Sequence, residues 1–237
     1  MTENTLLNIT DLRSGYGRVG IVNGVTFDVK VGEIVAVIGR NGVGKSTLMK
    51  SIIGEVSTFG GKITLKGEDI QKLPEAKRAQ MGIGYVPQGR GLFNSLTVGE
   101  NLRLGKLVGG TPKKTNYERV YEFFPVLKER LNQIAGTMSG GQQQQLAIGR
   151  ILIGNPKIIL LDEPSEGIQP NIVQSIGQII RRIRDEEELT VIIVEQNLDL
   201  IQATADRCIV IDKGKIVDEI SPEALADPKV AKMYLAI

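Results

Sequence analysis

Gly39-Arg40-Asn41-Gly42-Val43-Gly44-Lys45-Ser46-Thr47 fits the spacing G-x-x-x-x-G-K-[ST], in which glycines let successive backbone N–H groups surround phosphate oxygens. The continuous apolar run at 34–38 is typical of a strand buried on both faces of a parallel sheet, and residues 48–53 predict a helix that ends at Gly54. A phosphate would then lie at a helix N-terminus, where unpaired N–H groups and the helix dipole favour an anion. The stretch therefore predicts an α/β fold with a P-loop, in which Lys45 and Ser46 serve the terminal phosphates and Mg²⁺. The loop residues predicted to bind the nucleotide are Gly39, Asn41, Gly42, Gly44, Lys45, Ser46 and Thr47.

A second charged site is predicted where the apolar run at 158–161 ends in Asp162 and Glu163. Sheets of α/β proteins bind ligands at the carboxyl ends of their strands. Asp162 is predicted to hold hydrated Mg²⁺ together with Ser46. Glu163 is predicted to orient or deprotonate a water, a general-base role worth about 10²–10⁴ in rate. Without the phosphate loop, an acidic turn that ends a strand would explain the two carboxylates equally well.

Met138-Ser139-Gly140-Gly141-Gln142 predicts another helix start. Ser139 and Gln142 are three residues apart ahead of an apolar periodic run, which is the spacing of an N-cap and its capping-box partner. The helix should end at 154–156, where Gly-Asn-Pro is a strong stop signal. Alone, such a cap is a common structural device. Of the glutamines at 142–145, the first is predicted to face nucleotide or the neighbouring turn, and the others solvent or an interface.

The phosphate loop, the S-G-G-Q helix start and the strand that ends in Asp162-Glu163-Pro164, in this order, resemble the ATP-binding cassette (ABC) nucleotide-binding subunits over essentially the whole chain. The resemblance implies a P-loop NTPase core with an antiparallel β subdomain and an inserted helical subdomain. It implies that ATP lies between two cassettes, the phosphate loop of one facing the S-G-G-Q of the other. It also implies that Gln88 senses Mg²⁺ and the membrane partner, and that Tyr16 stacks on adenine rather than being simply a packed side chain. The nucleotide-binding residues implied at the helix start are Ser139, Gly140, Gly141 and Gln142.

Two residues depart from the family pattern. The chain contains no histidine, and Gln196 stands where most cassettes carry one. An amide donates to a phosphate oxygen and accepts from water, but it takes up no proton near neutral pH. We therefore expect Gln196 to position phosphate and Glu163 alone to supply base character. Gln169 replaces the usual aspartate before a proline, which puts coupling across the cassette pair through this residue in doubt.

With these two residues, the sequence resembles the cassettes of importers for branched-chain amino acids and for urea or short amides. Residues 88–102 are similar to the same subgroup. The subgroup implies two different cassettes beneath two transmembrane permease subunits, fed by an external substrate-binding protein, although a homodimer in isolation stays open. Leu92 and Phe93 are candidates to line the groove for a permease helix, with ordinary packing as the alternative. A urea or short-amide importer and a non-transport ABC ATPase, such as one for iron–sulfur assembly, remain alternative functions.

Composition indicates a protein that has no membrane span of its own. The 237 residues contain no apolar run near the 18 or so needed to cross a bilayer, and residues 1–5 carry no secretory-signal pattern. We expect a cytoplasmic protein, peripheral on the inner face of the membrane. The balance of 29 basic and 27 acidic residues argues against nucleic acid as a partner. The basic cluster at 181–184, followed by acidic residues at 185–188, predicts a solvated helix end and exit turn.

The order of apolar runs predicts one cassette over residues 1–237. An antiparallel portion at 6–29, with a return at 62–65, precedes the parallel core. The core with its β subdomain is predicted at about 5–90 and 155–237, and the helical subdomain at about 91–154. Cys208 is predicted to be a buried small hydrophobic residue. A hairpin turn at 212–215 and a last helix, with Ser221 as N-cap and Pro222 at its first position, complete the prediction.

Overall fold

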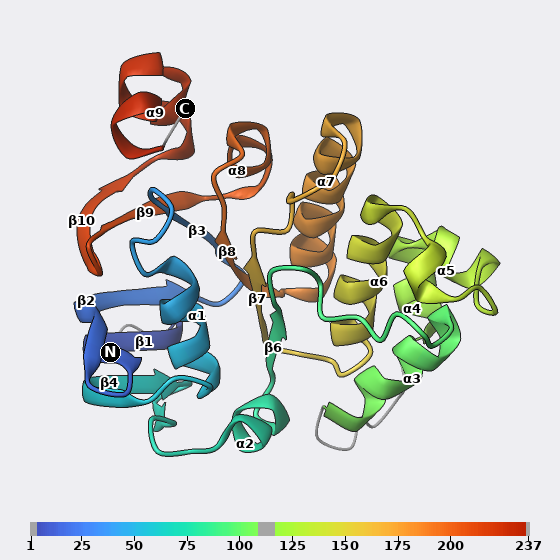
Figure 1. The fold of residues 1–237 in the computed structure, drawn as a ribbon, viewed down its shortest axis with the longest axis horizontal. Coiled ribbons are helices and arrows are strands. Elements are labelled where there is room, and N and C mark those ends of the chain that lie inside the picture. The colour runs from blue at the N-terminus through green and yellow to red at the C-terminus, as the bar shows by residue number, and fades with distance from the viewer. Residues whose placement is uncertain (1–3, 109–116, 236–237) are drawn as a thin grey trace.

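Two sheets organise the residues described by the computed structural model, 4–108 and 117–235 (Figure 1). The segment 1–5, which was predicted to carry no secretory signal, lies outside this range at residues 1–3. The larger sheet has the strand order β10-β9-β3-β8-β7-β6, and all of its strands are parallel except β10, which pairs antiparallel with β9. Its strands are β3 (Ile34–Ile38), β6 (Ile83–Val86), β7 (Ile158–Asp162), β8 (Thr190–Val194), β9 (Arg207–Asp212) and β10 (Lys215–Ile220).

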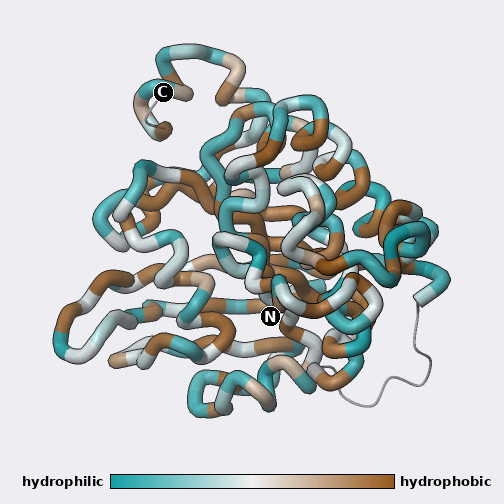
Figure 2. The backbone as a smooth tube through the Cα atoms, turned by 45° about the vertical axis from the view of Figure 1, so that its right-hand side comes forward, coloured by the Kyte–Doolittle hydropathy of each residue, from teal (hydrophilic) through white to brown (hydrophobic). Residues whose placement is uncertain are grey.

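The apolar runs formed the predicted parallel strands because both faces of the larger sheet are covered. Every residue of β3, β7 and β8 is buried. In Figure 2 the hydrophobic stretches concentrate along the central strands, and hydrophilic ones dominate the outer turns. The predicted turn between β9 and β10 is confirmed, with Lys213 and Gly214 both at positive φ.

The smaller sheet is antiparallel, with the order β2-β1-β4-β5. Its strands are β1 (Thr5–Tyr16), β2 (Val19–Lys30), β4 (Thr58–Leu65) and β5 (Glu68–Asp69). Helix α1 (Lys45–Ile53) ends at Gly54, as predicted, and shares one buried cluster with both sheets. Its side chains Leu48, Met49 and Ile52 contribute to that cluster, so α1 is fixed between the sheets. The short helix α2 (Glu75–Gln80) precedes β6.

Helices cover the opposite face of the larger sheet. Helices α6 (Gly140–Leu152) and α7 (Pro170–Glu187) share a buried cluster with its strands. Helices α3 (Val98–Val108), α4 (Tyr117–Phe123) and α5 (Pro125–Glu129), with the 3₁₀ turn at Ala135–Thr137, lie beside α6 in Figure 1. We call α3 to α6 the helical group. Near the C-terminus, α8 (Leu198–Thr204), a 3₁₀ segment (Pro222–Ala226) and α9 (Pro228–Tyr234) cover a third cluster, which contains Cys208 as predicted.

The predicted last helix is wrong in its start. Ser221 makes no side-chain cap hydrogen bond, and Pro222 opens only the 3₁₀ segment. The α-helix begins after Asp227, whose carboxylate accepts from the Lys229 N–H at 2.8 Å. Asp227 and Pro228 form a second start signal of the same type, and a capping aspartate with a hydrogen bond prevails over a serine without one.

The glutamine prediction is wrong for Gln144. This residue is 2% exposed, and its amide nitrogen has no hydrogen-bond partner within the described ranges. One turn of helix separates it from Gly141 and Ile148, which are also buried, so it lies on the face of α6 that packs into the protein.

The prediction of a solvated helix end is confirmed, since Arg181, Arg182 and residues 185–188 are exposed, but the predicted exit turn is wrong, because α7 continues through Glu187. Arg119 of α4 forms ion pairs with Glu186 and Glu187, and we call this contact the Arg119 bridge. Arg119 and Arg182 also flank the Phe123 ring, 4.8 and 5.1 Å from its centroid. The cluster therefore ties α7 to the helical group instead of only facing solvent.

Candidate functional site

The carboxyl ends of four adjacent strands form one edge that carries most of the predicted site residues. Strands β3, β8, β7 and β6 are neighbours in the sheet and run in the same direction. A cleft of about 520 Å³ opens at this edge. It is lined by Tyr16, Ile21, Asn41, Gly42, Gly44, Lys45, Ser46, Thr47, Gln88, Glu163 and Glu166.

The loop between β3 and α1 has the backbone that a phosphate cradle requires. Gly39, Gly42 and Gly44 have φ of 147°, 76° and 107°, a range that favours glycine. A Cβ on Gly39 would lie 2.2 Å from the carbonyl oxygen of Ile211, so no other residue fits there. The Lys45 ammonium crosses the loop and donates to the carbonyls of Gly39 (2.7 Å) and Arg40 (2.9 Å).

Lys45 is the cation of this cleft. Burial lowers its pKa, and the carboxylates of Glu163, Asp162 and Glu195 oppose that shift. Three acidic side chains thus hold charge around one ammonium at the start of α1. An anion that enters the loop meets both this ammonium and the N–H groups of the helix start.

Asp162 and Ser46 meet as a pair of oxygen ligands. Ser46 Oγ donates to Asp162 Oδ1 at 3.0 Å, and the Tyr85 hydroxyl donates to Asp162 Oδ2 at 3.2 Å. The carboxylate is 2% exposed, and burial raises its pKa, while the hydrogen bonds from Ser46 and Tyr85 oppose the shift. Burial and the Asp162 charge raise the pKa of Tyr85, so its hydroxyl keeps its proton and acts as the donor.

This donor set fits a magnesium ion that keeps ligands from elsewhere. Hydroxyl and carboxylate oxygens suit Mg²⁺, which commonly uses one or two protein ligands and completes its shell with water and phosphate oxygens. Within 4–108 and 117–235 no group of three or more His, Cys, Asp or Glu is placed to hold a metal alone. Gln88 contacts Glu163 rather than Asp162, so in this conformation the third predicted metal residue stands apart from the other two.

Glu163 is held by two amides. Gln88 Nε2 donates to Glu163 Oε2 at 3.1 Å, and Gln196 Nε2 lies 3.4 Å from Oε1. Gln196 also donates to Asn41 Oδ1 at 2.5 Å, so it bridges the phosphate loop and the acid. The backbone of Glu163 has φ 47°, a left-handed conformation that a non-glycine residue adopts only where its surroundings fix it. Its N–H donates to Val194 O at 2.9 Å, which fixes this turn to β8.

Glu195 is a site residue that the sequence analysis missed. One carboxylate oxygen accepts from the N–H groups of Gln196 (2.7 Å) and Asn197 (2.9 Å), and the other from that of Ser165 (3.2 Å). It is 3% exposed, and burial raises its pKa against the effect of these N–H donors. It joins the turn that carries Gln196 to the segment after Glu163. An acidic residue directly after the apolar run at 191–194 was the signal that could have found it.

The segment 139–142 lies outside this cleft. The capping box is confirmed: Gln142 N–H donates to Ser139 Oγ at 3.4 Å, and Ser139 N–H donates to Gln142 Oε1 at 3.1 Å. None of its residues lines the cleft, so one chain does not bring them to its own phosphate loop. Arg90 ties this helix to the neighbouring loop by donating to Gln143 Oε1 (3.2 Å) and Glu166 O (3.0 Å). Tyr16 is 52% exposed at the cleft wall, where a flat ring is free for stacking.

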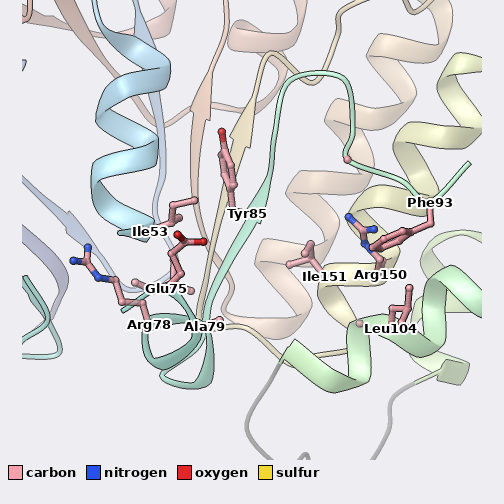
Figure 3. Close-up of a pocket in the computed structure, with 12 residues that line it drawn as sticks. Ile53, Glu75, Arg78, Ala79, Tyr85, Phe93, Leu104, Arg150 and Ile151 are labelled. Atoms are coloured by element: carbon pink, nitrogen blue, oxygen red, sulfur yellow. The ribbon is translucent and has the colours of Figure 1, made fainter. Parts of the chain in front are cut away.

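A second hollow, of about 330 Å³, lies between α2, β6, α3 and α6; we call it the lateral groove (Figure 3). Phe93 is 52% exposed on its wall, with the Arg150 guanidinium 5.7 Å from its ring centroid. Leu92 instead packs against the core, so only Phe93 of the predicted pair lines a groove. Burial lowers the pKa of Arg150. The groove is lined by Ile53, Glu75, Arg78, Ala79, Ile83, Tyr85, Gly91, Phe93, Leu104, Gly105, Arg150 and Ile151.

Comparison with known proteins places these features in context. A family model described as ABC transporter matches residues 22–166. The high-affinity branched-chain amino acid transport ATP-binding protein BraG of Pseudomonas aeruginosa is 43% identical over 97% of this chain and 99% of its own length. A probable branched-chain amino acid transport ATP-binding protein, LivF of Archaeoglobus fulgidus, is 34% identical over 98% and 99%. The structure of a nucleotide-free ATP-binding cassette from an ABC transporter superposes with a TM-score of 0.85 at 28% identity, covering 98% of this chain and 99% of that one.

Proposed function

The chain belongs to the ABC transporter family, whose ATP-binding subunits hydrolyse ATP, and from this premise we propose that it powers an importer of branched-chain amino acids. The observation that carries the substrate class is the alignment, along nearly the whole chain, with two ATP-binding proteins named for branched-chain amino acid transport. Nothing in the cleft or groove favours urea or short amides, or a role outside transport.

In this proposal the phosphate loop holds the β- and γ-phosphates of ATP. The Lys45 ammonium leaves its carbonyl partners for the phosphate oxygens, which attract it more strongly because they are charged. The N–H groups at 42–47 donate to the same phosphates at the start of α1. Tyr16 stacks on adenine, and its exposed ring at the cleft wall supports that role.

Ser46 and Asp162 hold Mg²⁺, and their contact at 3.0 Å supports a shared role. The ion would neutralise charge on the phosphates and orient them. Gln88 would become the third metal residue once its amide no longer donates to Glu163. Its amide oxygen would then be able to turn toward the ion.

Glu163 acts as the general base for the attacking water, and Gln196 orients the γ-phosphate. The bridge from Gln196 to both Asn41 and Glu163 supports this division, since one amide contacts the loop and the base together. Histidine chemistry is absent from the chain, so Glu163 is the acceptor for the proton of the water.

A second cassette completes each nucleotide site. Residues 139–142 stand outside the cleft of their own chain, which supports a role in capping the γ-phosphate bound by a partner. Ser139 and Gly141 would make that contact. The partner is a different cassette chain in the transporter, and residues 1–237 form one cassette whose helical subdomain spans about 91–154.

The lateral groove receives a permease helix in this proposal. Its apolar lining and the exposed Phe93 support the docking of an amphipathic segment. None of the helices within the described ranges is long and apolar enough to cross a bilayer. Two permease subunits would therefore supply the membrane passage, an external binding protein would deliver the substrate, and this chain would lie at the cytoplasmic face.

The test is affinity purification of the tagged chain from detergent-solubilised membranes of its native cell, with mass spectrometry of what accompanies it. We expect two multi-span proteins and a second cassette. The binding protein of the same transporter is then titrated with leucine, isoleucine, valine and urea, and we expect it to bind the amino acids. Recovery only from the soluble fraction, with nucleic acid or cluster-assembly proteins, would contradict transport, whereas a preference for urea would contradict only the substrate class.

A further inference from the structure

Tyr85 connects the lateral groove with the pair formed by Asp162 and Ser46, and Ser46 lines the cleft. Its side chain forms part of the groove wall, while its hydroxyl donates to Asp162 Oδ2 at 3.2 Å. In Figure 3 the Tyr85 ring stands among the residues that line the groove, and its oxygen points away from Glu75 and Ala79. One side chain of β6 therefore joins the groove wall to the Asp162 carboxylate, whose other oxygen contacts Ser46 of the cleft.

The hydrogen bond from Tyr85 gives the Asp162 carboxylate its second side-chain partner. Ser46 occupies Oδ1 at 3.0 Å and Tyr85 occupies Oδ2, so the buried carboxylate has a partner on each side. If the Ser46 hydroxyl turns toward a cation, the Tyr85 hydroxyl still donates to Asp162 Oδ2. This hydrogen bond then limits rotation of the carboxyl group. A ligand carboxylate oriented in this way requires less reordering when the ion binds.

We propose that Tyr85 is a positioning residue that orients Asp162 for Mg²⁺ and that transmits occupancy of the lateral groove to this carboxylate. The inference rests on the proposed function, which assigns the ion to Ser46 and Asp162 and a permease helix to the groove. A segment that packs into the groove contacts the Tyr85 ring directly, and a shift of the ring moves the hydroxyl against Asp162. Strand β6 pairs with β7 along its length, so the backbone beneath both residues stays fixed while the side chains respond.

The substitution Tyr85→Phe removes only the hydroxyl and keeps the ring in the groove wall. Tyr121→Phe is its matched control, because Tyr121 is a half-buried tyrosine of α4 that packs against Tyr117 and Lys128, away from both hollows. The first readout is binding of a fluorescent ATP analogue, with Mg²⁺ titrated from EDTA upward. We expect unchanged affinity for the analogue in EDTA and about 10- to 100-fold more Mg²⁺ for half-maximal enhancement of its binding in Tyr85→Phe, from loss of a hydrogen bond to a charged metal ligand.

The second readout compares the isolated chain with the purified transporter. In the wild type, assembly with the permeases should shift the Mg²⁺ dependence of hydrolysis, and in Tyr85→Phe the shift should be at least halved. Superimposable Mg²⁺ curves for wild type and Tyr85→Phe would overturn the positioning role, and an equal assembly shift in both would overturn the transmission. Failure of the proposed function is distinct, because wild type itself would then show no ATP hydrolysis or no permeases.

Discussion

Gln88 and Glu163 meet at the carboxyl edge of the parallel sheet, with Gln88 Nε2 3.1 Å from Glu163 Oε2. Gln196 approaches the other oxygen of the same carboxylate at 3.4 Å. Both neighbours are neutral amides, which hold the carboxylate in place and leave it as the only basic group of the three. In the proposed mechanism, hydrolysis therefore depends on the Glu163 carboxylate alone.

Glu163→Gln should lower kcat by about 10²–10⁴ while ATP binding is retained, because the amide keeps its shape and loses its basicity. Single-turnover hydrolysis and nucleotide binding measure the two effects separately. Glu129→Gln is the control and should leave the rate unchanged, since Glu129 is exposed on α5 and does not line the cleft. A rate near that of the wild type in Glu163→Gln would show that another group accepts the proton.

Lys45→Ala should weaken ATP binding about 10- to 100-fold, since a hydrogen bond to a charged group contributes about 1.5–3 kcal/mol. Calorimetric titration of the isolated chain with ATP measures the change. Lys50→Ala removes the same type of side chain from the same helix, where it pairs with Glu55 near the surface, and should bind ATP normally. Equal affinities in the two variants would refute the phosphate-loop assignment.

Glu195→Gln should change how stability depends on pH. Burial raises the pKa of Glu195 in the folded chain, so this group stabilises the fold below its unfolded pKa of about 4.3 and loses that contribution as pH rises through the folded pKa. The stability of the wild type relative to Glu195→Gln should therefore fall as pH rises from about 4 through the raised folded pKa. Melting temperatures of both proteins in one buffer series give this difference, and a difference that grows with pH would be the contrary result.

Phe93→Ser should weaken recovery of the permease subunits severalfold while ATP binding by the isolated chain stays unchanged, because the substitution removes an exposed apolar contact of the lateral groove. Co-purification yield and nucleotide affinity are the measurements. Val217→Ser removes an apolar side chain that is similarly exposed but lies on β10, outside that groove, and it should leave the yield unchanged. Equal losses in both variants would point to general destabilisation instead of docking.

Gln144→Met should raise the stability of the fold by about 1–2 kcal/mol, because it replaces a buried amide whose nitrogen is unpaired among the described residues with an apolar side chain of similar length. For a chain of this size, the melting temperature would rise by roughly 2–8 °C. Gln145→Met, at a partly exposed neighbour, should have little effect. A lower melting temperature for Gln144→Met would mean that the amide has a partner, such as a buried water.

The sequence predicted those parts of the site whose chemistry is local in the chain. The phosphate loop and the Ser139 cap each depend on a few consecutive residues, so spacing alone identifies them. The roles of Tyr85 and Glu195 depend on neighbours across the sheet: Tyr85 reaches Asp162 because β6 lies beside β7, and Glu195 reaches Ser165 because β8 lies beside β7. Strand order was not readable from the apolar runs.

The predictions that the structure corrects were wrong for similar physical reasons. Ser221 and Asp227 are both acceptable helix starts, and only the hydrogen bond that forms distinguishes them. The pairing of Arg119 with Glu186 joins residues 67 positions apart, and a local charge pattern carries no information about that contact. Gln144 looked like a solvent residue because its three neighbours are glutamines too.

The Arg119 bridge holds α4 to α7 close to the end of α6 that lies farthest from Ser139. Arg119 lies with Leu152, at the far end of α6, and with Pro156 and Leu189, beside the starts of β7 and β8. Ser139 lies at the opposite end of the same helix, about 20 Å away at 1.5 Å per residue. A 10° swing about the bridge would displace Ser139 by roughly 3 Å at this length, comparable to one hydrogen bond, and leave Arg119 almost in place. The fixed end is thus beside the starts of β7 and β8, so a rotation of the helical group about it would move Ser139, at the opposite end of α6, the most.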